Sequence, residues 1–316
     1  MASAQGLFAQ RLLVALTAFQ AVQSLVIPPP QDAANREGAT SWHAMNKSVE
    51  ELFCSHVAEA EALVQEVTWK VQWMVAKNKA SPRVHKVVAT DWSMRPKTCS
   101  VVSSSGVLLN HTYGDKIDAA ELVFRFNDAE AGPAVASIAG RHDDIRLLNR
   151  LQEKMITRPS RQQLPGSVHA LYVLPLISEK AISFVTQEAG RLHPGMNVVQ
   201  GNKRLVELAE EVMESTYGVR PKAVSTGFYG VLTAMVMCNE VHTYGFTESR
   251  LNALAPNHYY SDQAPLPKAA RKAADREVGH ADLDLERRFW KMLATNHDAA
   301  ETDIAMLPGL RSLQCS

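Results

Sequence analysis

Short apolar runs alternate with amphipathic stretches between about residue 97 and residue 246. Helical periodicity, with apolar residues three and four positions apart, occurs near 178–190, 203–216 and 228–238. Because parallel strands need a crossover connection, this alternation predicts one α/β domain, a mostly parallel sheet with helices on both faces. The predicted strands are 99–102, 121–126, 145–149, 169–174, 196–199 and 241–246.

The first 47 residues lack this alternation. The stretch from Leu12 to Ile27 is uncharged, follows Arg11 and precedes three prolines. A membrane span needs about 20 apolar residues, so residues 1–27 are consistent with either a cleavable signal peptide or a type II signal anchor. Residues 28–47 have no periodicity and are expected to form a stem or linker. Ser48 and Glu51 form a capping box that opens a long amphipathic helix, so the folded domain is expected to span 48–316.

Charge and cysteine content narrow the possible partners. Lys plus Arg and Asp plus Glu both number 33, so no net positive charge favours binding to a nucleic-acid backbone, and we exclude nucleic acid as the main partner. The four cysteines lie far apart, without the spacing of a zinc site. An even number of cysteines beside an export segment favours two disulfides. Asn46 and Asn110 begin glycosylation sequons, which are relevant if the chain enters the secretory lumen.

Two turns are candidates for nucleotide binding. Residues 103–106, Ser-Ser-Ser-Gly, follow the strand that Cys99 opens, and small residues with free backbone N–H groups allow a phosphate or ribose to approach. Ser225, Thr226 and Gly227 precede an apolar helix that Cys238 closes, and hydroxyls at a helix N-terminus can bind an anion. An ordinary turn and an ordinary N-cap explain the same residues. Together the two turns favour a nucleotide-sugar enzyme of the secretory pathway.

The order of four motifs between about residues 95 and 290 resembles the eukaryotic sialyltransferases, glycosyltransferase family 29. The large motif is matched by the run from Cys99 to Gly106 and by Arg125-Phe126-Asn127, and the small motif by the run from Ser225 to Phe246. The third motif is matched by His258-Tyr259-Tyr260 and the very small motif by His280. Ser103 and Ser104 replace a usual Gly-Asn, and Val224 replaces a usual proline. Glu286 lies one residue farther from His280 than the family spacing.

The resemblance implies a Rossmann-like domain, a variant of the GT-A type, with inverting, metal-independent transfer and no cofactor. Sialic acid would move from a CMP-sugar donor to a glycan hydroxyl on a glycoprotein or glycolipid. His280 would be the general base, since an imidazole titrates near working pH, and His258 would stabilise the departing CMP phosphate. Asn127 is suited to the donor because an amide can pair with both edges of cytosine or ribose. The implied donor-binding residues are Ser104, Ser105, Asn127, Ser225, Thr226 and Gly227.

The resemblance also implies a disulfide between Cys99 and Cys238, fastening the two turns, which leaves Cys54 and Cys315 to form the second. It places the domain in the Golgi lumen, held by residues 1–27 as a type II anchor, or secreted if that segment is cleaved.

Three alternatives remain open at this stage. The related acidic sugar Kdo is an alternative to sialic acid as the group transferred from CMP. Asp282 and Asp284 form an Asp-x-Asp that could hold a divalent metal on a nucleotide diphosphate sugar, although acidic residues also favour a helix N-terminus without metal. The substitution at Ser104 and the displaced Glu286 would also fit a family member that binds CMP-sugar without turnover. His142-Asp143-Asp144 is predicted to be a solvated turn before a strand.

Overall fold

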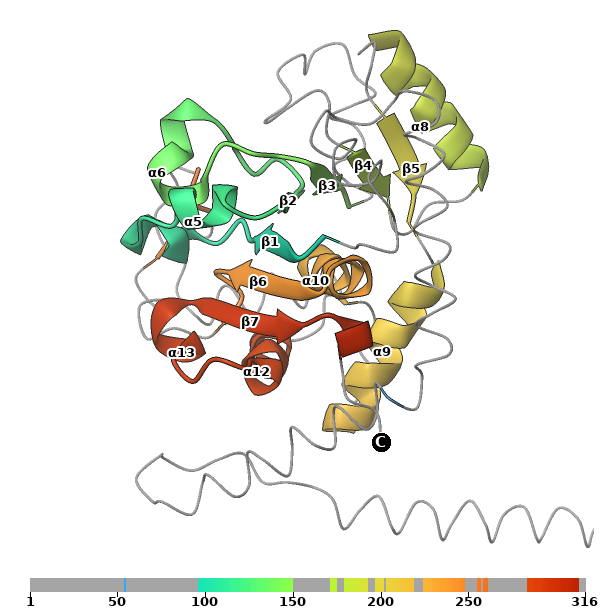
Figure 1. Cartoon of the computed structure of the whole chain (residues 1–316). Helices are drawn as coiled ribbons and strands as arrows, with labels where there is room; N and C mark the ends of the chain where they lie inside the picture. Colours follow the sequence, from blue (N-terminus) through green and yellow to red (C-terminus); the bar gives the residue numbers. More distant parts are fainter. Residues whose placement is uncertain are drawn as a thin grey trace, which may run out of the picture.

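The computed structural model describes Cys54 and residues 96–149, 171–174, 179–192, 197–201, 203–218, 224–247, 255–256, 258–260 and 283–312. In this part of the chain, seven strands form one sheet in the order β5-β4-β3-β2-β1-β6-β7 (Figure 1). All neighbouring pairs are parallel except β6 and β7. The strands are β1 (Thr98–Val102), β2 (Leu122–Phe126), β3 (Ile145–Leu147), β4 (Leu171–Leu174), β5 (Asn197–Gln200), β6 (Glu240–Tyr244) and β7 (Ile304–Pro308).

The longer helices are α8 (Glu179–Leu192), α9 (Lys203–Tyr217), α10 (Thr226–Met237) and α12 (Leu283–Leu293). Short helical segments lie between the strands, and the last of them follows β7. They are η1 (Gly106–Asn110), α5 (Gly114–Asp118), η2 (Pro133–Val135), α6 (Ala136–Ala139), α13 (Ala299–Thr302) and η4 (Leu310–Ser312).

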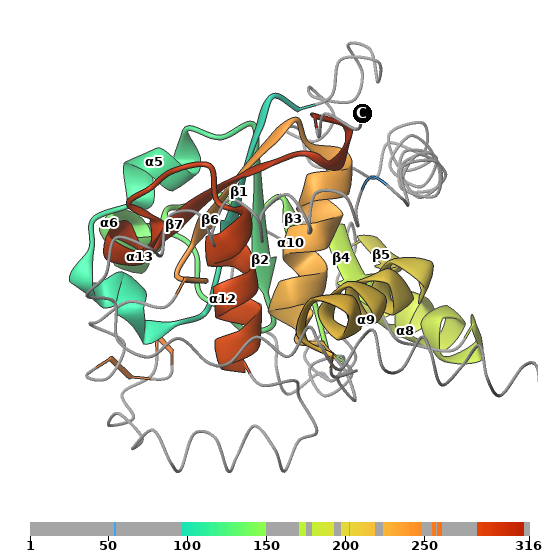
Figure 2. The same ribbon diagram turned by 90° about the horizontal axis from the view of Figure 1, so that it is seen from below.

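Alternating side chains of the central strands build a separate core on each face of the sheet. Cys99 and Val101 of β1 pack with residues of α9, α10 and α12, which lie together on one side (Figure 2). Val102 and Val123 point the other way and pack with residues of η1, α5 and α6. Helices therefore cover both faces, as the strand and helix alternation predicts, because successive side chains of a strand point to opposite faces.

Helix α10 is the central helix of the first face. Every residue from Phe228 to Met237 is buried, which is why this segment is apolar on all sides. A Cβ on Gly230 would lie only 2.2 Å from Cε1 of Phe126, so glycine at this position lets the helix approach β2 closely.

The strand order places the point where the chain changes direction across the sheet between β1 and β6. From β1 the chain moves outward to β5 and then returns through α9 and α10 to add β6 on the other side of β1. The segments that follow β1 and β6 therefore diverge. In open α/β sheets, ligands bind at the carboxyl ends of the strands at such a point.

Most predicted elements are confirmed within one or two residues at each end. The antiparallel edge strand β7 was not predicted. Three predicted segments lie outside the described residues, apart from Cys54: the apolar stretch from Leu12 to Ile27, the stem, and the amphipathic helix expected to begin at Ser48. No helix in the described ranges is long and apolar enough to cross a membrane.

Candidate functional site

Segments from four parts of the chain meet at the carboxyl edge of the sheet. After β1, Ser105 forms an isolated antiparallel bridge with His258, and the Tyr259 N–H donates to the Ser104 carbonyl at 3.1 Å. After β6, the Gly245 carbonyl accepts a hydrogen bond from Ser103 Oγ at 3.1 Å. The predicted residues Ser104, Ser105 and His258 are therefore brought together by direct contacts.

The second predicted turn reaches the same edge through aromatic packing. A Cβ on Gly227, at the start of α10, would lie 2.9 Å from Cε1 of Phe246. Phe246 in turn packs edge-on against Phe126 at the end of β2, with ring centroids 5.8 Å apart. The N-terminus of α10 thus lies beside the ends of β2 and β6, where its free N–H groups favour an anion.

The serine turn after β1 uses two of its three hydroxyls to hold its own shape. Ser103 Oγ accepts from the Ser105 N–H at 3.1 Å as well as donating to Gly245. Ser105 Oγ accepts from the Val107 N–H at 3.3 Å and caps η1. The Ser104 side chain makes no hydrogen bond within the described part of the chain, so it is the hydroxyl of this turn most available to a ligand.

Asn127 has a left-handed backbone conformation, and one of the two polar groups of its side chain already has a hydrogen-bond partner. Its φ of 47° lies in the left-handed region, where asparagine is tolerated better than most residues. Its Oδ1 accepts from the Asn149 N–H at 2.9 Å, and its carbonyl accepts from Arg146 Nη1 at 2.7 Å. The Nδ2 group makes no hydrogen bond to a described residue. The Nδ2 donor and the second lone pair of Oδ1 therefore remain for a ligand, and the two-sided pairing expected from the sequence stays a prediction.

A buried ion pair fixes the turn that carries Asn127. Arg146 and Asp143 are fully buried side chains joined at 2.5 Å, and Arg146 Nη1 also donates to the Ala129 carbonyl at 2.9 Å. Asp144 is buried too and accepts from the Val123 N–H at 2.9 Å. The prediction of a solvated turn at 142–144 is therefore wrong. The charge of Arg146 inside an apolar strand was the sequence signal that the turn's acidic residues had a buried partner.

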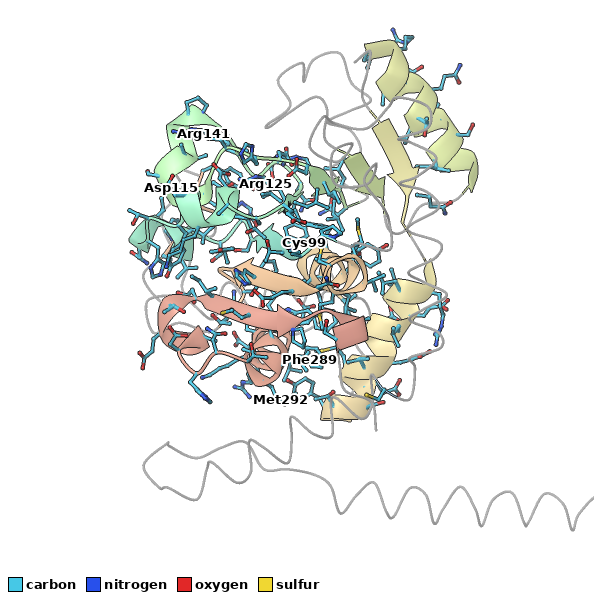
Figure 3. All side chains as sticks on the ribbon, viewed as in Figure 1. Cys99, Asp115, Arg125, Arg141, Phe289 and Met292 are labelled. Atoms are coloured by element: carbon cyan, nitrogen blue, oxygen red, sulfur yellow. A yellow bond between two sulfur atoms is a disulfide. The ribbon has the colours of Figure 1, made fainter. Side chains whose placement is uncertain are left out.

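Arg125, beside Arg146 in the sheet register, ties the same face to α6. Its Nε donates to the His142 carbonyl at 2.8 Å and its Nη2 to the Ala139 carbonyl at 2.5 Å, and Figure 3 shows it in the interior beside the α5 and α6 segment. Burial lowers the pKa of this guanidinium. Arg125 and Arg146 therefore fix the backbone of the segments around the site through hydrogen bonds to carbonyl groups.

His258 is held by aromatic neighbours. Its ring stacks on Tyr260 with centroids 5.1 Å apart and planes inclined by 17°. The Tyr260 hydroxyl donates to Asp128 Oδ1 at 2.7 Å, and the Tyr259 hydroxyl donates to the Glu130 carbonyl. Burial lowers the pKa of His258, and the nearby Asp128 carboxylate acts in the opposite direction. Burial also raises the pKa of Tyr259 to about 12.

Glu286 has a defined partner despite its shifted position in the sequence. Its Oε1 accepts from the Ser225 N–H at 2.8 Å, and its Oε2 accepts from Ser225 Oγ at 2.5 Å. Ser225 Oγ also accepts from the Phe228 N–H at 3.0 Å, as an N-cap. The buried carboxylate of α12 therefore fixes the start of α10. Because Glu286 binds both the N–H and the hydroxyl of Ser225, the side chain of Thr226 and the backbone N–H groups of residues 226–227 are the groups of this turn most open to a ligand.

The disulfide between Cys99 and Cys238 is confirmed, with Cα atoms 6.1 Å apart. It does not fasten the two turns directly. Cys238 follows the C-terminus of α10 and Cys99 is near the start of β1, so the bridge lies about 18 Å from the other end of this 12-residue helix. Cys54 is also bonded in a disulfide, and its expected partner Cys315 lies outside the described residues.

The remaining candidates are only partly covered by the structure. His280, Asp282 and Asn46 lie outside the described residues. Asp284 is in the first turn of α12 and pairs with Arg287 at 3.1 Å. Asn110 is exposed at the end of η1. Within the described ranges, no group of three or more His, Cys, Asp or Glu side chains is arranged to hold a metal ion.

Comparison with known proteins gives one consistent family. The model of glycosyltransferase family 29 (sialyltransferase) matches residues 45–174 and 198–298. A beta-galactoside alpha-2,6-sialyltransferase 2 from Bos taurus is 26% identical over 240 residues, which cover 70% of this chain and 46% of the relative. An alpha-N-acetylneuraminide alpha-2,8-sialyltransferase from Xenopus laevis is 26% identical over 187 residues, covering 54% of this chain and 51% of the relative. The chain thus matches about half the length of these relatives.

Among solved structures, a mammalian sialyltransferase in complex with Gal-beta-1-3GalNAc-ortho-nitrophenol is similar with a TM-score of 0.43 and 15% identity. That match covers 73% of this chain and 84% of the other. The family model covers well over half of the sequence and includes all four motifs. The chain therefore belongs to glycosyltransferase family 29, the sialyltransferases.

Proposed function

We propose that this protein transfers sialic acid from a CMP-sugar donor to a hydroxyl of a glycan. The observation that carries the proposal is the meeting of the serine turn, Asn127, His258 and the N-terminus of α10 at one edge of the sheet. The Ser104 hydroxyl, Asn127 Nδ2 and the first N–H groups of α10 have no hydrogen-bond acceptor among the described residues, so they are suited to an anionic nucleotide. Family membership supplies the reaction class.

In the proposed mechanism, the nucleotide lies over the turns that follow β1 and β2. Asn127 Nδ2 and the Ser104 hydroxyl would donate to the cytidine or ribose, and the backbone of residues 226–227 to the phosphate. His280 would take the proton from the acceptor hydroxyl as its oxygen forms a bond to the anomeric carbon. The bond from that carbon to the phosphate oxygen would break, with inversion, and His258 would donate a hydrogen bond to the leaving CMP phosphate.

We also propose a metal-independent mechanism, in which the carboxylates of the described site have protein partners of their own. Asp128 accepts from Tyr260, Asp143 pairs with Arg146, and Asp284 pairs with Arg287. A leaving monophosphate also builds up less charge than a diphosphate, so hydrogen-bond donors and a helix terminus can stabilise it.

The contacts of Glu286 argue against the alternative of a family member that binds the donor without activity. The extra residue between His280 and Glu286 motivated that rival, yet Glu286 still reaches Ser225 with both carboxylate oxygens. We therefore favour an active enzyme. We place it in the Golgi lumen, with Asn46 and Asn110 as glycosylation sites and the segment 1–27 as the membrane anchor.

The decisive experiment is a donor screen with purified protein. CMP-sialic acid, CMP-Kdo, UDP-sugars and GDP-sugars are offered with glycoprotein and glycolipid acceptors, with and without EDTA. We expect transfer from CMP-sialic acid that EDTA does not reduce, and loss of transfer with retained CMP binding in His280→Ala. Transfer only from a UDP- or GDP-sugar with added metal would contradict the proposal, as would CMP-sugar binding without any transfer or hydrolysis.

A further inference from the structure

A carboxylate without a role in the proposed mechanism is linked to His258 through Tyr260. Asp128 follows Asn127 in the turn after β2, and Tyr260 lies between Asp128 and the imidazole. The Tyr260 ring stacks on His258 with centroids 5.1 Å apart, while its hydroxyl donates to Asp128 Oδ1 at 2.7 Å. Three side chains from two distant parts of the sequence thus form a connected row.

Both ends of this row are fixed to the sheet. On one side, Arg146 donates to the carbonyls of Asn127 and Ala129, which bracket Asp128. On the other side, the backbone of His258 bridges Ser105, and the Tyr259 N–H donates to the Ser104 carbonyl. The position of Asp128 relative to His258 is therefore set by backbone contacts as well as by the Tyr260 hydroxyl.

We propose that Asp128 is a positioning residue for the reaction: acting through Tyr260, it holds His258 in place and favours its protonated form as the leaving-group donor. This inference rests on the proposed function, since it deepens the role given there to His258. A protonated imidazole makes a charge-assisted hydrogen bond to phosphate, which is stronger than a neutral one.

The charges around His258 support this direction. Burial lowers its pKa, and Asp128 is the charged neighbour that raises it. Its other described contacts, Ser105 and the ring of Tyr260, are uncharged, and burial raises the pKa of Tyr260. The guanidinium groups of Arg125 and Arg146 lower the pKa of Tyr259, and Arg146 acts in the same direction on Tyr260. Asp128 is thus the described negative charge that offsets burial of the imidazole.

The sign of the expected effect follows directly. Asp128→Asn keeps an oxygen that accepts from Tyr260 but removes the negative charge, so the pKa of His258 falls and the protonated form is lost at lower pH. Tyr260→Phe keeps the stacked ring and removes the hydroxyl that holds the carboxylate, so its effect has the same sign and is smaller. Asp115→Asn removes an exposed carboxylate on α5 and serves as the matched control.

The first test is an NMR titration of the His258 ring protons in the full chain without donor, with the signal assigned by its loss in His258→Gln. We expect the midpoint of His258 to fall in Asp128→Asn, to fall less in Tyr260→Phe, and to stay unchanged in Asp115→Asn. An unchanged midpoint in Asp128→Asn, with a native spectrum elsewhere, overturns the proposal. Because this test needs no turnover, its result does not depend on the proposed function.

The second test is the pH profile of kcat/KM for CMP-sialic acid. Since one pKa unit is a tenfold change in the protonated ratio, we compare activity one pH unit above and one pH unit below the His258 midpoint of the unmodified protein. We expect the ratio of the first activity to the second to fall about two- to fivefold in Asp128→Asn. A merely structural role would lower activity equally at both pH values. A parallel loss of that kind, or an unchanged profile beside a shifted NMR midpoint, overturns the catalytic part of the proposal.

Discussion

The contact between Glu286 and Ser225 gives the sharpest prediction for stability, because it joins α12 to the start of α10 through a single buried carboxylate. Glu286 is 4% exposed and accepts two hydrogen bonds from one residue, at 2.8 Å from the backbone N–H and 2.5 Å from Oγ. Glu286→Ala removes both acceptors and leaves the N–H and hydroxyl of Ser225 without them.

The magnitude follows from these two hydrogen bonds. A hydrogen bond to a charged group contributes about 1.5–3 kcal/mol, and an unsatisfied buried donor costs about 1–3 kcal/mol. Removing the buried charge recovers part of its desolvation cost. We therefore expect Glu286→Ala to lower the free energy of unfolding by about 2–4 kcal/mol. Glu286→Gln retains one acceptor oxygen and should cost about half as much.

Urea unfolding of the purified domain, followed by circular dichroism, measures this difference as a change in midpoint at constant slope. Glu301→Ala is the matched control, because this glutamate is exposed on α13 and its removal should change stability by less than about 0.5 kcal/mol. If Glu286→Ala is as stable as the control, the carboxylate does not anchor the start of α10 and the reasoning fails.

Three further predictions concern the disulfide and two glycines in helices. Replacing both Cys99 and Cys238 by Ala should cost about 2–5 kcal/mol, seen as a lower urea midpoint, because the bridge closes a separation of 139 residues; equal midpoints would contradict this. Gly230→Ala should lower the thermal midpoint, since overpacking against Phe126 costs about 1–3 kcal/mol. Gly190→Ala in α8 should raise the thermal midpoint, by the equivalent of about 0.5–1 kcal/mol, because alanine favours the helix and its Cβ would meet no atom within 4 Å. If Gly230→Ala and Gly190→Ala shift the midpoint in the same direction, the packing argument is refuted.

The pattern of the sequence was enough to predict the α/β class and most of the central sheet. Strands β1 and β2 are mostly apolar runs of strand length, α9 has the helical period, and α10 is apolar on all sides. Such elements can be predicted because burial on both faces gives a continuous apolar run, and burial on one face of a helix gives the helical spacing. The edge strand β7 was not predicted although its run Ile-Ala-Met-Leu-Pro is apolar, because a short apolar run ending in a proline does not by itself distinguish a strand from a helix or turn.

The motifs of the family marked the residues of the site, but only the tertiary structure decided how they are used. The sequence could not show that Asn127 Oδ1 accepts a hydrogen bond from the Asn149 N–H, that Arg146 donates to the Asn127 carbonyl, or that the Tyr260 hydroxyl donates to Asp128. It also could not show that the disulfide lies at the far end of α10 from the turns. These contacts join residues 19 to 139 positions apart, so they depend on strand order and helix packing, which local composition and spacing do not encode.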